Sequence, residues 1–570
     1  MFDLTIAISG PAGAGMQSIS FTLAKTFTRA GYSAYIYHDL MSRIRGGNNT
    51  SIVRLKTAPV NSSKETFDLL VVLDKEAAER NRTKVKQNGF LVFDGDKIAP
   101  TGSGENLISV PLEKLALEAG KDKITINSVA TGAVLALLGS KVQTECFGVV
   151  KELFASKGEE VVNNNIAAIK AGFNYVLANY REKIKLDIEP LRVVRKRFLL
   201  TGSEALGLGA IAAGVKFYAG YPMSPSTAIM EYIAARAKEY NIAFEQAEDE
   251  IAAINMAIGA GYGGVRSMTA TSGGGFALMI EGVSLAGMTE TPVVIVIAQR
   301  PGPATGFPTR TEQGDLNMAL HAGHGDFARV ILAPRNAAEA VYIMSKAFNY
   351  AEKYQIPVIV LTDQCFNDSS YTVNLADVKS EPPDRGEFFN AAGAEAYTYK
   401  RYELLGDGCI SKRMLPGTEN QVVYADSDEH TMEGHISEDG KFRERMTRKR
   451  LDKYIEIAKK IDKPIYYGEA DPKVVFTGWG SSYGALREAA DLLNEKGIPA
   501  AVLHFNMIFP LPEIQLPFDL ASLDAFVCVE NNVTGQFADI FEKHQRISFT
   551  KRILRYDGRP LTAEFILDNL

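Results

Sequence analysis

The chain has 570 residues, a net charge of -6, and an ordinary globular composition with 46% hydrophobic and 23% charged residues. A single hydrophobic core stops growing near roughly 250–300 residues, so this length predicts several domains. The weak acidic balance argues against general nucleic-acid binding, which needs a basic surface. No apolar run approaches the ~20 residues of a membrane-spanning helix, and the N-terminus lacks a basic leader, so we expect a cytoplasmic protein without a membrane segment.

Residues 1–184 are predicted to form an α/β domain, followed by a charged linker at residues 185–197. The domain opens with a strand-like run, then a glycine-rich turn at Gly10–Gly15, then a helix over Met16–Ala30. Further short apolar runs alternate with helical patterns. This alternation is typical of βαβ units and a parallel sheet.

The turn at Gly10–Gly15 is open to three interpretations. Backbone N–H groups at Gly13 and Gly15 could bind a phosphate at the start of the helix, and Arg45, in an Arg-Gly-Gly run, could grip one. With Asp39 at the end of the second predicted strand, the turn could instead bind NAD or FAD, although its GxxGxG spacing departs from the GxGxxG of dinucleotide folds. A tight turn without a ligand is equally consistent with the sequence.

Two more α/β domains are predicted downstream, at residues 198–379 and 464–570, because β-branched apolar runs alternate there with helical patterns. Residues 380–463 between them are polar and rich in glycine and proline, and we interpret them as an insertion or connector. The basic helical run Lys441–Lys459 within this insertion is expected to be solvated or to face another subunit.

Three loops that follow predicted strands of the middle domain carry candidate ligand contacts. Tyr221, Pro222 and Ser224 lie in the first loop, where Ser224 could bind a carboxylate or the segment could be a plain strand–helix turn. Gly273 and Gly274 lie in the second, where they permit close approach of a ligand or a flexible turn. Arg300 opens the third, and its planar fork suits a carboxylate, with a structural ion pair as the alternative.

An acidic cluster, Glu245–Glu250, precedes a run of small and apolar residues. Acids at a helix start ordinarily compensate the helix dipole. The apolar run, however, predicts a helix that is almost entirely buried, and a buried carboxylate needs a partner. A glutamate placed against the pyrimidine of thiamine would have one, since proton sharing there promotes formation of the reactive carbanion.

Metal sites are not predicted in this chain. An iron–sulfur cluster needs about four thiolates in tight spacings, whereas the four cysteines are scattered without a CxxC pair, so we expect inert thiols. The histidines form no helical HExxH pattern, and structural hydrogen bonds are the favoured interpretation for them. The cysteines are Cys146, Cys365, Cys409 and Cys528, and the histidines considered are His321, His324, His430 and His435.

Taken together, these motifs resemble the 2-oxoacid:ferredoxin oxidoreductase family, in the fused gamma–alpha arrangement of its 2-oxoglutarate-type members. Tyr221–Thr227 resembles the family's YPITPS signature, with Met and Ser in place of Ile and Thr. Arg300–Leu316 resembles RPGPSTGxPTxTEQGDL almost residue by residue, and Ala322–Pro334 is similar to GHGExxRxVLAP. The resemblance implies three α/β domains with mainly parallel sheets: a gamma-type domain, a thiamine pyrimidine-binding domain and a transketolase C-terminal-like domain.

The resemblance also implies roles for particular residues. Glu250, preferred over Glu248 by the spacing of the small residues after it, would be the catalytic glutamate that contacts the pyrimidine of thiamine diphosphate. Ser224, Arg300 and Thr309 would bind the 2-oxoacid. The cofactor contacts would be Glu250, Tyr221, Pro222, Gly273 and Gly274, with Gly13, Gly15 and Arg45 in the part of the gamma-type domain that would cover coenzyme A.

The family's reaction is the oxidative decarboxylation of a 2-oxoacid with coenzyme A to acyl-CoA and CO2, and it requires a separate beta subunit. The resemblance places the diphosphate, Mg2+ and a [4Fe–4S] cluster in that subunit, passes electrons to ferredoxin, and implies an (αβ)2 heterotetramer. We favour 2-oxoglutarate over pyruvate or a branched-chain 2-oxoacid. A nicotinamide- or flavin-dependent enzyme and a non-catalytic assembly subunit are the alternative classes.

Overall fold

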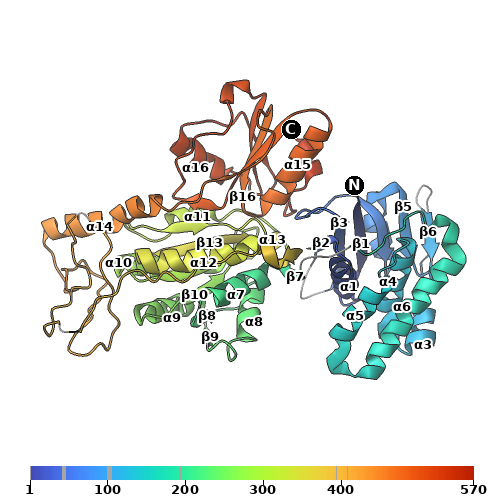
Figure 1. Ribbon diagram of the computed structural model, residues 1–570, viewed down its shortest axis with the longest axis horizontal. Helices are drawn as coiled ribbons and strands as arrows, with labels where there is room; N and C mark the ends of the chain where they lie inside the picture. The colour runs from blue at the N-terminus through green and yellow to red at the C-terminus, as the bar shows by residue number, and fades with distance from the viewer. Residues whose placement is uncertain (1, 42–45, 99–105, 192–195, 393, 407) are drawn as a thin grey trace. The chain divides into compact units, whose positions relative to one another are not determined.

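The computed structural model describes residues 2–41, 46–98, 106–191, 196–392, 394–406 and 408–570. The described chain forms three β-sheets with helices packed against them, as the predicted α/β fold class requires (Figure 1). It divides into two compact units, and the second and third sheets both lie in the second of them. The first unit is Met1–Thr201 with Asp368–Asp377 and Thr562–Phe565, and the second is Gly202–Asn367 with Val378–Leu561 and Ile566–Leu570. The residue boundaries predicted for the domains remain predictions.

The sheet of the first unit has the strand order β6-β5-β4-β1-β3-β2-β14-β7. It is a mixed sheet, because β3 runs antiparallel between β1 and β2, while β1, β4, β5 and β6 are parallel neighbours. The last two strands arrive from distant parts of the chain and pair antiparallel with each other. The strands are β1 (Asp3–Pro11), β2 (Ser33–Asp39), β3 (Asn48–Lys56), β4 (Phe67–Val72), β5 (Val85–Phe93), β6 (Asn106–Ser109), β7 (Arg197–Thr201) and β14 (Ser370–Asn374).

Helices cover this sheet and build its core (Figure 1). Almost every residue of α4 is buried because its sequence is apolar or small around its whole circumference. It packs on α6 through glycines: a methyl group at Gly132 or Gly172 would overlap a backbone carbonyl of the other helix. The helices are α1 (Met16–Arg29), α2 (Lys75–Asn81), α3 (Leu112–Gly120), α4 (Ile126–Leu137), α5 (Gln143–Phe154) and α6 (Glu159–Tyr180).

The second unit contains a seven-stranded sheet with the order β18-β12-β13-β11-β10-β8-β9. All neighbours are parallel except β12 and β18. The central strand β11 is buried at every position, which explains its unbroken apolar sequence. The strands are β8 (Phe217–Gly220), β9 (Ala243–Gln246), β10 (Ser267–Thr271), β11 (Val293–Gln299), β12 (Val330–Leu332), β13 (Pro357–Asp363) and β18 (Met507–Phe509).

The helices of this layer are α7 (Gly202–Ala212), α8 (Thr227–Ala234), α9 (Glu250–Tyr262), α10 (Gly273–Met288), α11 (Leu316–His321), α12 (Ala337–Tyr354) and α13 (Gln364–Asp368). In chain order, α8 to α12 connect successive parallel strands of this sheet, whereas α7 and α13 link it to β7 and β14 of the first sheet.

The third sheet has the order β15-β17-β16-β19-β20, with parallel pairing except at β15. Its chain also supplies β18 to the seven-stranded sheet, and the two sheets share one hydrophobic core. The elements are β15 (Ile465–Gly468), β16 (Val474–Trp479), β17 (Ala500–Phe505), β19 (Ala525–Glu530), β20 (Lys551–Leu554), α15 (Tyr483–Glu495) and α16 (Gln536–Gln545), and the chain ends with α17 (Ala563–Asp568).

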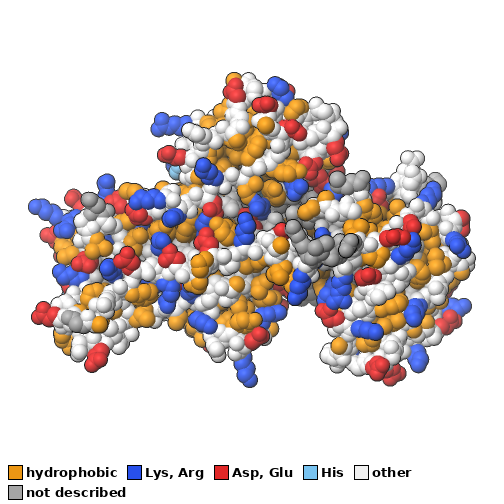
Figure 2. Space-filling view, viewed as in Figure 1, with side chains coloured by type: hydrophobic (Ala, Val, Ile, Leu, Met, Phe, Trp, Pro, Cys, Tyr) orange, Lys and Arg blue, Asp and Glu red, His pale blue; other side chains and the backbone are white. Residues whose placement is uncertain are grey.

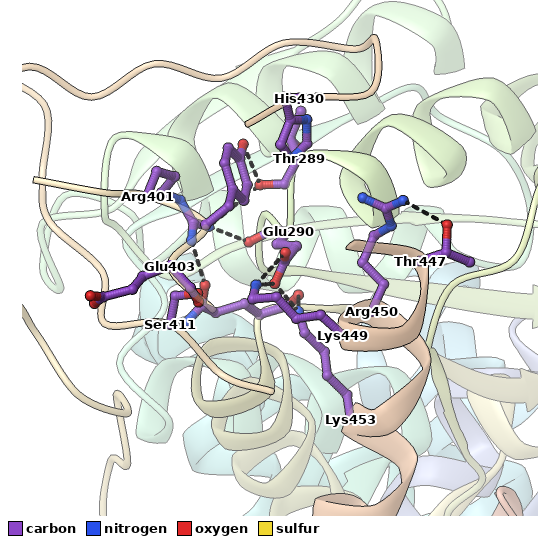
Figure 3. Close-up of polar contacts among 12 residues, drawn as sticks. Thr289, Glu290, Arg401, Glu403, Ser411, His430, Thr447, Lys449, Arg450 and Lys453 are labelled. Atoms are coloured by element: carbon purple, nitrogen blue, oxygen red, sulfur yellow. Dashed lines mark hydrogen bonds and ion pairs between the residues drawn. The ribbon is translucent and has the colours of Figure 1, made fainter. Parts of the chain in front are cut away.

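The insertion at residues 380–463 consists of irregular chain and one long helix, α14 (Gly440–Ala458). This basic helix was expected to be solvated or to face another subunit. For one side of the helix the expectation is wrong, because the side chains there are buried within this chain. Lys449 and Lys453 are buried, and each forms a 2.6 Å ion pair with the fully buried Glu290 (Figure 3). Arg401 of the insertion donates to the backbone carbonyl of Glu290 at 2.6 Å. The lysines can be buried because a carboxylate partners their charge.

Acidic and basic side chains are spread over the visible face, with hydrophobic side chains between them (Figure 2). Within the described residues, no helix is both long and apolar enough to cross a membrane. All four cysteines are buried free thiols. Over the same described part of the chain, no group of three or more potential metal ligands is clustered.

Candidate active site

The predicted loops of the middle domain meet at one edge of the seven-stranded sheet. Strands β9, β8, β10, β11 and β13 are parallel and adjacent in that order, so the segments after them emerge at the same edge. Open α/β sheets bind ligands at the carboxyl ends of their strands. The segments that emerge here carry Glu250, Ser224, Gly273 and Gly274, and Arg300.

Among the acids of the 245–250 cluster, the structure buries Glu250. Glu248 is exposed, and Asp249 caps α9 by accepting a hydrogen bond from the Ala252 N–H at 2.7 Å. Asp249 therefore performs the ordinary capping role expected of an acid at a helix start. Glu250, the first residue of α9, is only 3% exposed.

The Glu250 carboxyl lies against the start of α10. A methyl group at Gly275 would lie 2.6 Å from Glu250 Oε1 and would overlap the Thr271 hydroxyl, so this position requires glycine. Oε1 is buried, and it has no hydrogen-bond partner among the described residues. Burial raises the pKa of Glu250, a hydrogen bond from its own backbone N–H partly opposes this, and the neighbouring Asp249 charge raises the pKa further. The site thus contains a buried carboxyl group whose pKa is shifted upward and whose Oε1 has no partner among the described residues.

Arg300 follows β11, and its Nη1 donates to the backbone carbonyl of Ser224 at 2.7 Å. This is the only hydrogen bond of the guanidinium to the described residues, which leaves its other N–H groups able to bind a ligand. Burial lowers the pKa of Arg300, while the charge of Asp315 opposes that change. The predicted pair of Ser224 and Arg300 is therefore in contact, although through the serine carbonyl and not its hydroxyl.

A short series of contacts joins Glu250 to Arg300. Thr271, which adjoins Glu250 at Gly275, directs its hydroxyl to the Met223 sulfur at 4.0 Å. Met223 precedes Ser224, whose carbonyl accepts from Arg300. The two side chains on which the thiamine hypothesis depends thus lie at one edge of one sheet, in the segments that follow β9 and β11, with β8 and β10 between these strands.

The remaining predicted residues of this edge differ in exposure. Tyr221 and Pro222 are exposed in the loop after β8, and Gly274 is exposed with open space where a side chain would be. Gly273 is buried. Thr309 is also buried, at 6% exposure, in the loop that Arg300 opens.

Sequence reasoning missed Asp315, which ends the Arg300 loop. A methyl group at Gly273 would overlap both of its carboxylate oxygens, and its buried Oδ2 has no hydrogen-bond partner among the described residues. Burial raises the pKa of Asp315 to about 6; the charge of Glu312 contributes and that of Arg300 opposes. The only sequence signal was an acid directly before the short helix α11, which ordinarily indicates a cap.

The loop of residues 300–315 is held in place by the two sheets of the second unit. The Thr311 hydroxyl donates to Asp363 at 3.1 Å, at the end of β13. Gln313 donates to the Trp479 carbonyl at 3.1 Å and accepts from the Asn531 N–H at 3.1 Å, both in the third α/β layer. The third layer therefore fixes the loop that carries Arg300.

In the first unit, Gly13 and Gly15 both have φ of +86°, which favours glycine. A side chain at Gly15 would overlap the Asn127 amide, whereas Gly13 has open space around it. Because β3 separates β1 from β2, Asp39 is not on a strand adjacent to β1, as the ribose-binding acid of a dinucleotide fold would be. Arg45, the third predicted contact of this region, lies outside the described residues.

Comparisons with known proteins agree with these observations. Residues 208–449 match the family "Pyruvate flavodoxin/ferredoxin oxidoreductase, thiamine diP-bdg", and residues 5–175 match "Pyruvate ferredoxin/flavodoxin oxidoreductase". The 2-oxoacid:ferredoxin oxidoreductase subunit alpha of a Sulfolobus species is 31% identical over 98% of this chain and 95% of its own length. The 2-oxoglutarate synthase subunit KorA of Archaeoglobus fulgidus is 38% identical over 55% of this chain and 82% of its own.

A solved structure is similar over the whole chain. It is the 2-oxoglutarate:ferredoxin oxidoreductase from Magnetococcus marinus, with 2-oxoglutarate, coenzyme A and succinyl-CoA bound. Its sequence is 31% identical, the TM-score is 0.91, and the match covers 100% of this chain and 99% of that one.

Proposed function

Since this chain belongs to the 2-oxoacid:ferredoxin oxidoreductase family, as an alpha subunit with a fused gamma-like domain, we propose that it supplies half of a thiamine diphosphate site. The complete enzyme would oxidatively decarboxylate a 2-oxoacid with coenzyme A to acyl-CoA and CO2, and would pass the electrons to ferredoxin. The observation that carries this proposal is the buried Glu250 Oε1, which has no hydrogen-bond partner among the described residues and lies at the sheet edge where the loops of Ser224 and Arg300 also emerge.

The residues at this edge fit the pyrimidine of thiamine diphosphate. Glu250 Oε1 is a buried acceptor without a partner among the described residues, Gly275 packs closely against it, and the neighbouring Gly274 has open space where a side chain would be. Bound thiamine diphosphate would supply a carbon nucleophile and a sink for the electron pair released with CO2. Glu250 would share a proton with a ring nitrogen of the pyrimidine, and the upward shift of its pKa by burial is in the direction that favours such sharing. Tyr221, Pro222 and Gly273 would border the ring.

Arg300 would bind the carboxylate of the 2-oxoacid. Its guanidinium is oriented by the Ser224 carbonyl and keeps N–H groups for a two-point contact with a carboxylate. The hydroxyl groups of Ser224 and Thr309 would position the oxygens of the substrate. Partial burial of the site strengthens each of these charged contacts relative to water.

The other half of the site would come from a beta subunit, whose existence the alpha designation of the relatives implies. We propose that the beta subunit holds the diphosphate, Mg2+ and a [4Fe–4S] cluster, and that the complex is an (αβ)2 heterotetramer. Gly13, Gly15 and Arg45 of the gamma-like domain would contact coenzyme A. The exposed left-handed turn at Gly13 offers backbone N–H groups at the start of α1, as a phosphate contact requires.

We propose 2-oxoglutarate as the preferred substrate. The relative from Archaeoglobus fulgidus is a 2-oxoglutarate synthase subunit, and the structure from Magnetococcus marinus contains 2-oxoglutarate and succinyl-CoA. Pyruvate and branched-chain 2-oxoacids are the alternatives. Measuring kcat/KM for 2-oxoglutarate, pyruvate and 2-oxoisovalerate on the purified complex, with coenzyme A and a viologen dye, tests the choice; a higher value for either alternative would contradict it.

The Glu250 role is tested by Glu250→Gln in the assembled complex, with the exposed neighbour Glu248→Gln as the matched control. Loss of a proton-sharing group typically costs 10²–10⁴-fold in rate, so we expect a loss of that order from Glu250→Gln and almost none from the control. Equal activities would instead support a non-catalytic assembly subunit. Binding of NAD or FAD by the isolated chain would support the nucleotide-dependent alternative, against which the position of β3 argues.

A further inference from the structure

Asp315 occupies a position in the candidate site that is unfavourable for stability. Its carboxyl group is pressed against Gly273, the first residue of α10, where a methyl group would lie 2.4 Å from both carboxylate oxygens. Its buried Oδ2 accepts no hydrogen bond from the described residues. A buried oxygen without a partner destabilises a fold, and proteins retain such groups mainly at functional sites. The position of this carboxyl group therefore calls for a functional explanation.

The backbone around Asp315 is fixed by three buried glutamines that bond in the same way. Each side-chain amide donates to one backbone carbonyl and accepts from one backbone N–H, at distances of 2.8–3.1 Å. These contacts leave the Asp315 carboxyl group little freedom to move away from Gly273. The contacts are Gln299 with the Thr362 carbonyl and the Asp315 N–H, Gln313 with the Trp479 carbonyl and the Asn531 N–H, and Gln536 with the Gly314 carbonyl and the Asn317 N–H.

Asp315 and Arg300 lie at the two ends of one loop, and Gln299 brings these ends together. Gln299 directly precedes Arg300 in the chain, and its side chain accepts the Asp315 N–H at 2.9 Å. The charge of Asp315 opposes the lowering of the Arg300 pKa by burial, and the charge of Arg300 opposes the rise of the Asp315 pKa. The two side chains thus act on each other through charge, and no hydrogen bond to Asp315 occupies the guanidinium among the described residues.

The other charges around Asp315 are few. Glu312, in the same loop, adds to the rise in the pKa of Asp315 that burial causes. The three glutamines are neutral, and the first turn of α10 contains no charged side chain. Glu250 lies against Gly275, two residues further along α10, and is not among the charges that act on Asp315. Among the described residues, Arg300 is therefore the one cation, and Glu312 the one anion, that acts on this carboxyl group.

We propose that Asp315 is a positioning residue that sets, through its own charge, how strongly Arg300 holds the carboxylate of the 2-oxoacid. The inference rests on the proposed function, since it takes Arg300 as the carboxylate contact. An ionised Asp315 leaves the pair close to neutral and repels an incoming anion, whereas a protonated Asp315 leaves the full charge of Arg300 to the substrate. Binding of the 2-oxoacid is therefore coupled to the uptake of a proton from solvent at Asp315, and it weakens as the pH rises.

The test compares the pH dependence of KM for the 2-oxoacid in the wild-type complex, in Asp315→Asn and in the control Glu339→Gln. Glu339 is a matched control, because it is a buried carboxyl whose pKa burial raises and on which neither Arg300 nor Asp315 acts. In the wild type, KM should rise roughly 3–30-fold between pH 5.5 and pH 8, as Asp315 loses its proton from a pKa raised to about 6. The control should show the same rise, whereas Asp315→Asn should keep a low KM throughout.

A lower KM at pH 8 separates the effect of charge from damage to the fold, because a damaged site does not bind its substrate more tightly. An Asp315→Asn complex whose KM keeps the wild-type dependence on pH, or lies above the wild-type value, would overturn the proposal. If the variant does not turn over, the Kd for the 2-oxoacid from equilibrium dialysis is compared in the same way. Absence of turnover with every 2-oxoacid in the wild-type complex would instead contradict the proposed function, so the two failures are distinguishable.

Discussion

Replacement of Asp315 by Asn should stabilise the second unit, and the gain should depend on pH. Burial, with a contribution from Glu312 and against the attraction of Arg300, raises the pKa of Asp315 from 3.8 to about 6. A carboxyl whose folded-state pKa is raised favours the folded state below its unfolded pKa, and this contribution is lost as the pH rises through 6. The shift corresponds to about 3 kcal/mol at pH 8, and to roughly half of that at pH 5.

Urea unfolding of the isolated chain can measure this gain. The chain has one tryptophan, Trp479, which is buried in the unit that contains Asp315 and whose carbonyl accepts a hydrogen bond from Gln313 in the same loop. Its fluorescence therefore reports the unfolding of the relevant unit. Glu495→Gln, at an exposed carboxyl at the end of α15, is the control and should leave stability nearly unchanged. Asp315→Asn protein that is no more stable than the wild type at pH 8, or a gain that is constant with pH, would refute the reasoning.

Three further changes have defined outcomes. Glu290→Gln leaves two buried lysines without a charge partner, so the free energy of unfolding measured in urea should fall by about 3–5 kcal/mol. A decrease below about 1 kcal/mol would show that the ion pairs contribute little. Arg300→Lys replaces a planar fork by a point charge, so steady-state kinetics should show KM for the 2-oxoacid raised roughly 10–100-fold in an intact complex, and an unchanged KM would argue against carboxylate binding there. Gly13→Ala should cost about 1–2 kcal/mol of backbone strain, and Gly15→Ala clearly more, because its methyl group also overlaps the Asn127 amide; thermal unfolding that ranks them the other way would contradict this.

The sequence predicted those parts of the fold that a local pattern specifies. The buried strand β11 was recognised because every residue in it is apolar or β-branched up to Gln299. The strand β3 was missed because it begins with polar residues. Asn48 is buried there because its side chain accepts from the Ser9 hydroxyl at 3.0 Å and donates to Asp74 at 3.0 Å. Such satisfaction of polar groups depends on the tertiary structure, so no local pattern reveals it.

Candidate site residues could also be predicted where a local pattern in the sequence indicates them. Residues whose burial depends on contacts with other loops could not. Arg300 and Ser224 were predicted as ligand contacts because they follow expected strands of a parallel sheet, and that rule requires only the sequence. The choice of Glu250 over Glu248 came from a family resemblance, and the structure adds the physical distinction between a buried and an exposed side chain. Asp315 was missed because its burial depends on contact with Gly273, a residue of another loop.

Two buried glutamates of the same unit, Glu290 and Glu250, differ in the partners that their carboxyl groups have. Glu290 has two lysines at 2.6 Å, and their charges hold its pKa below the usual range despite complete burial (Figure 3). Glu250 forms no ion pair with the described residues, and burial raises its pKa. The same unit thus contains one buried carboxyl that two lysines neutralise and one that they do not. Because an unpartnered buried acceptor destabilises the folded chain, a ligand or subunit that donated a hydrogen bond to Glu250 Oε1 would make the Glu250 arrangement more favourable.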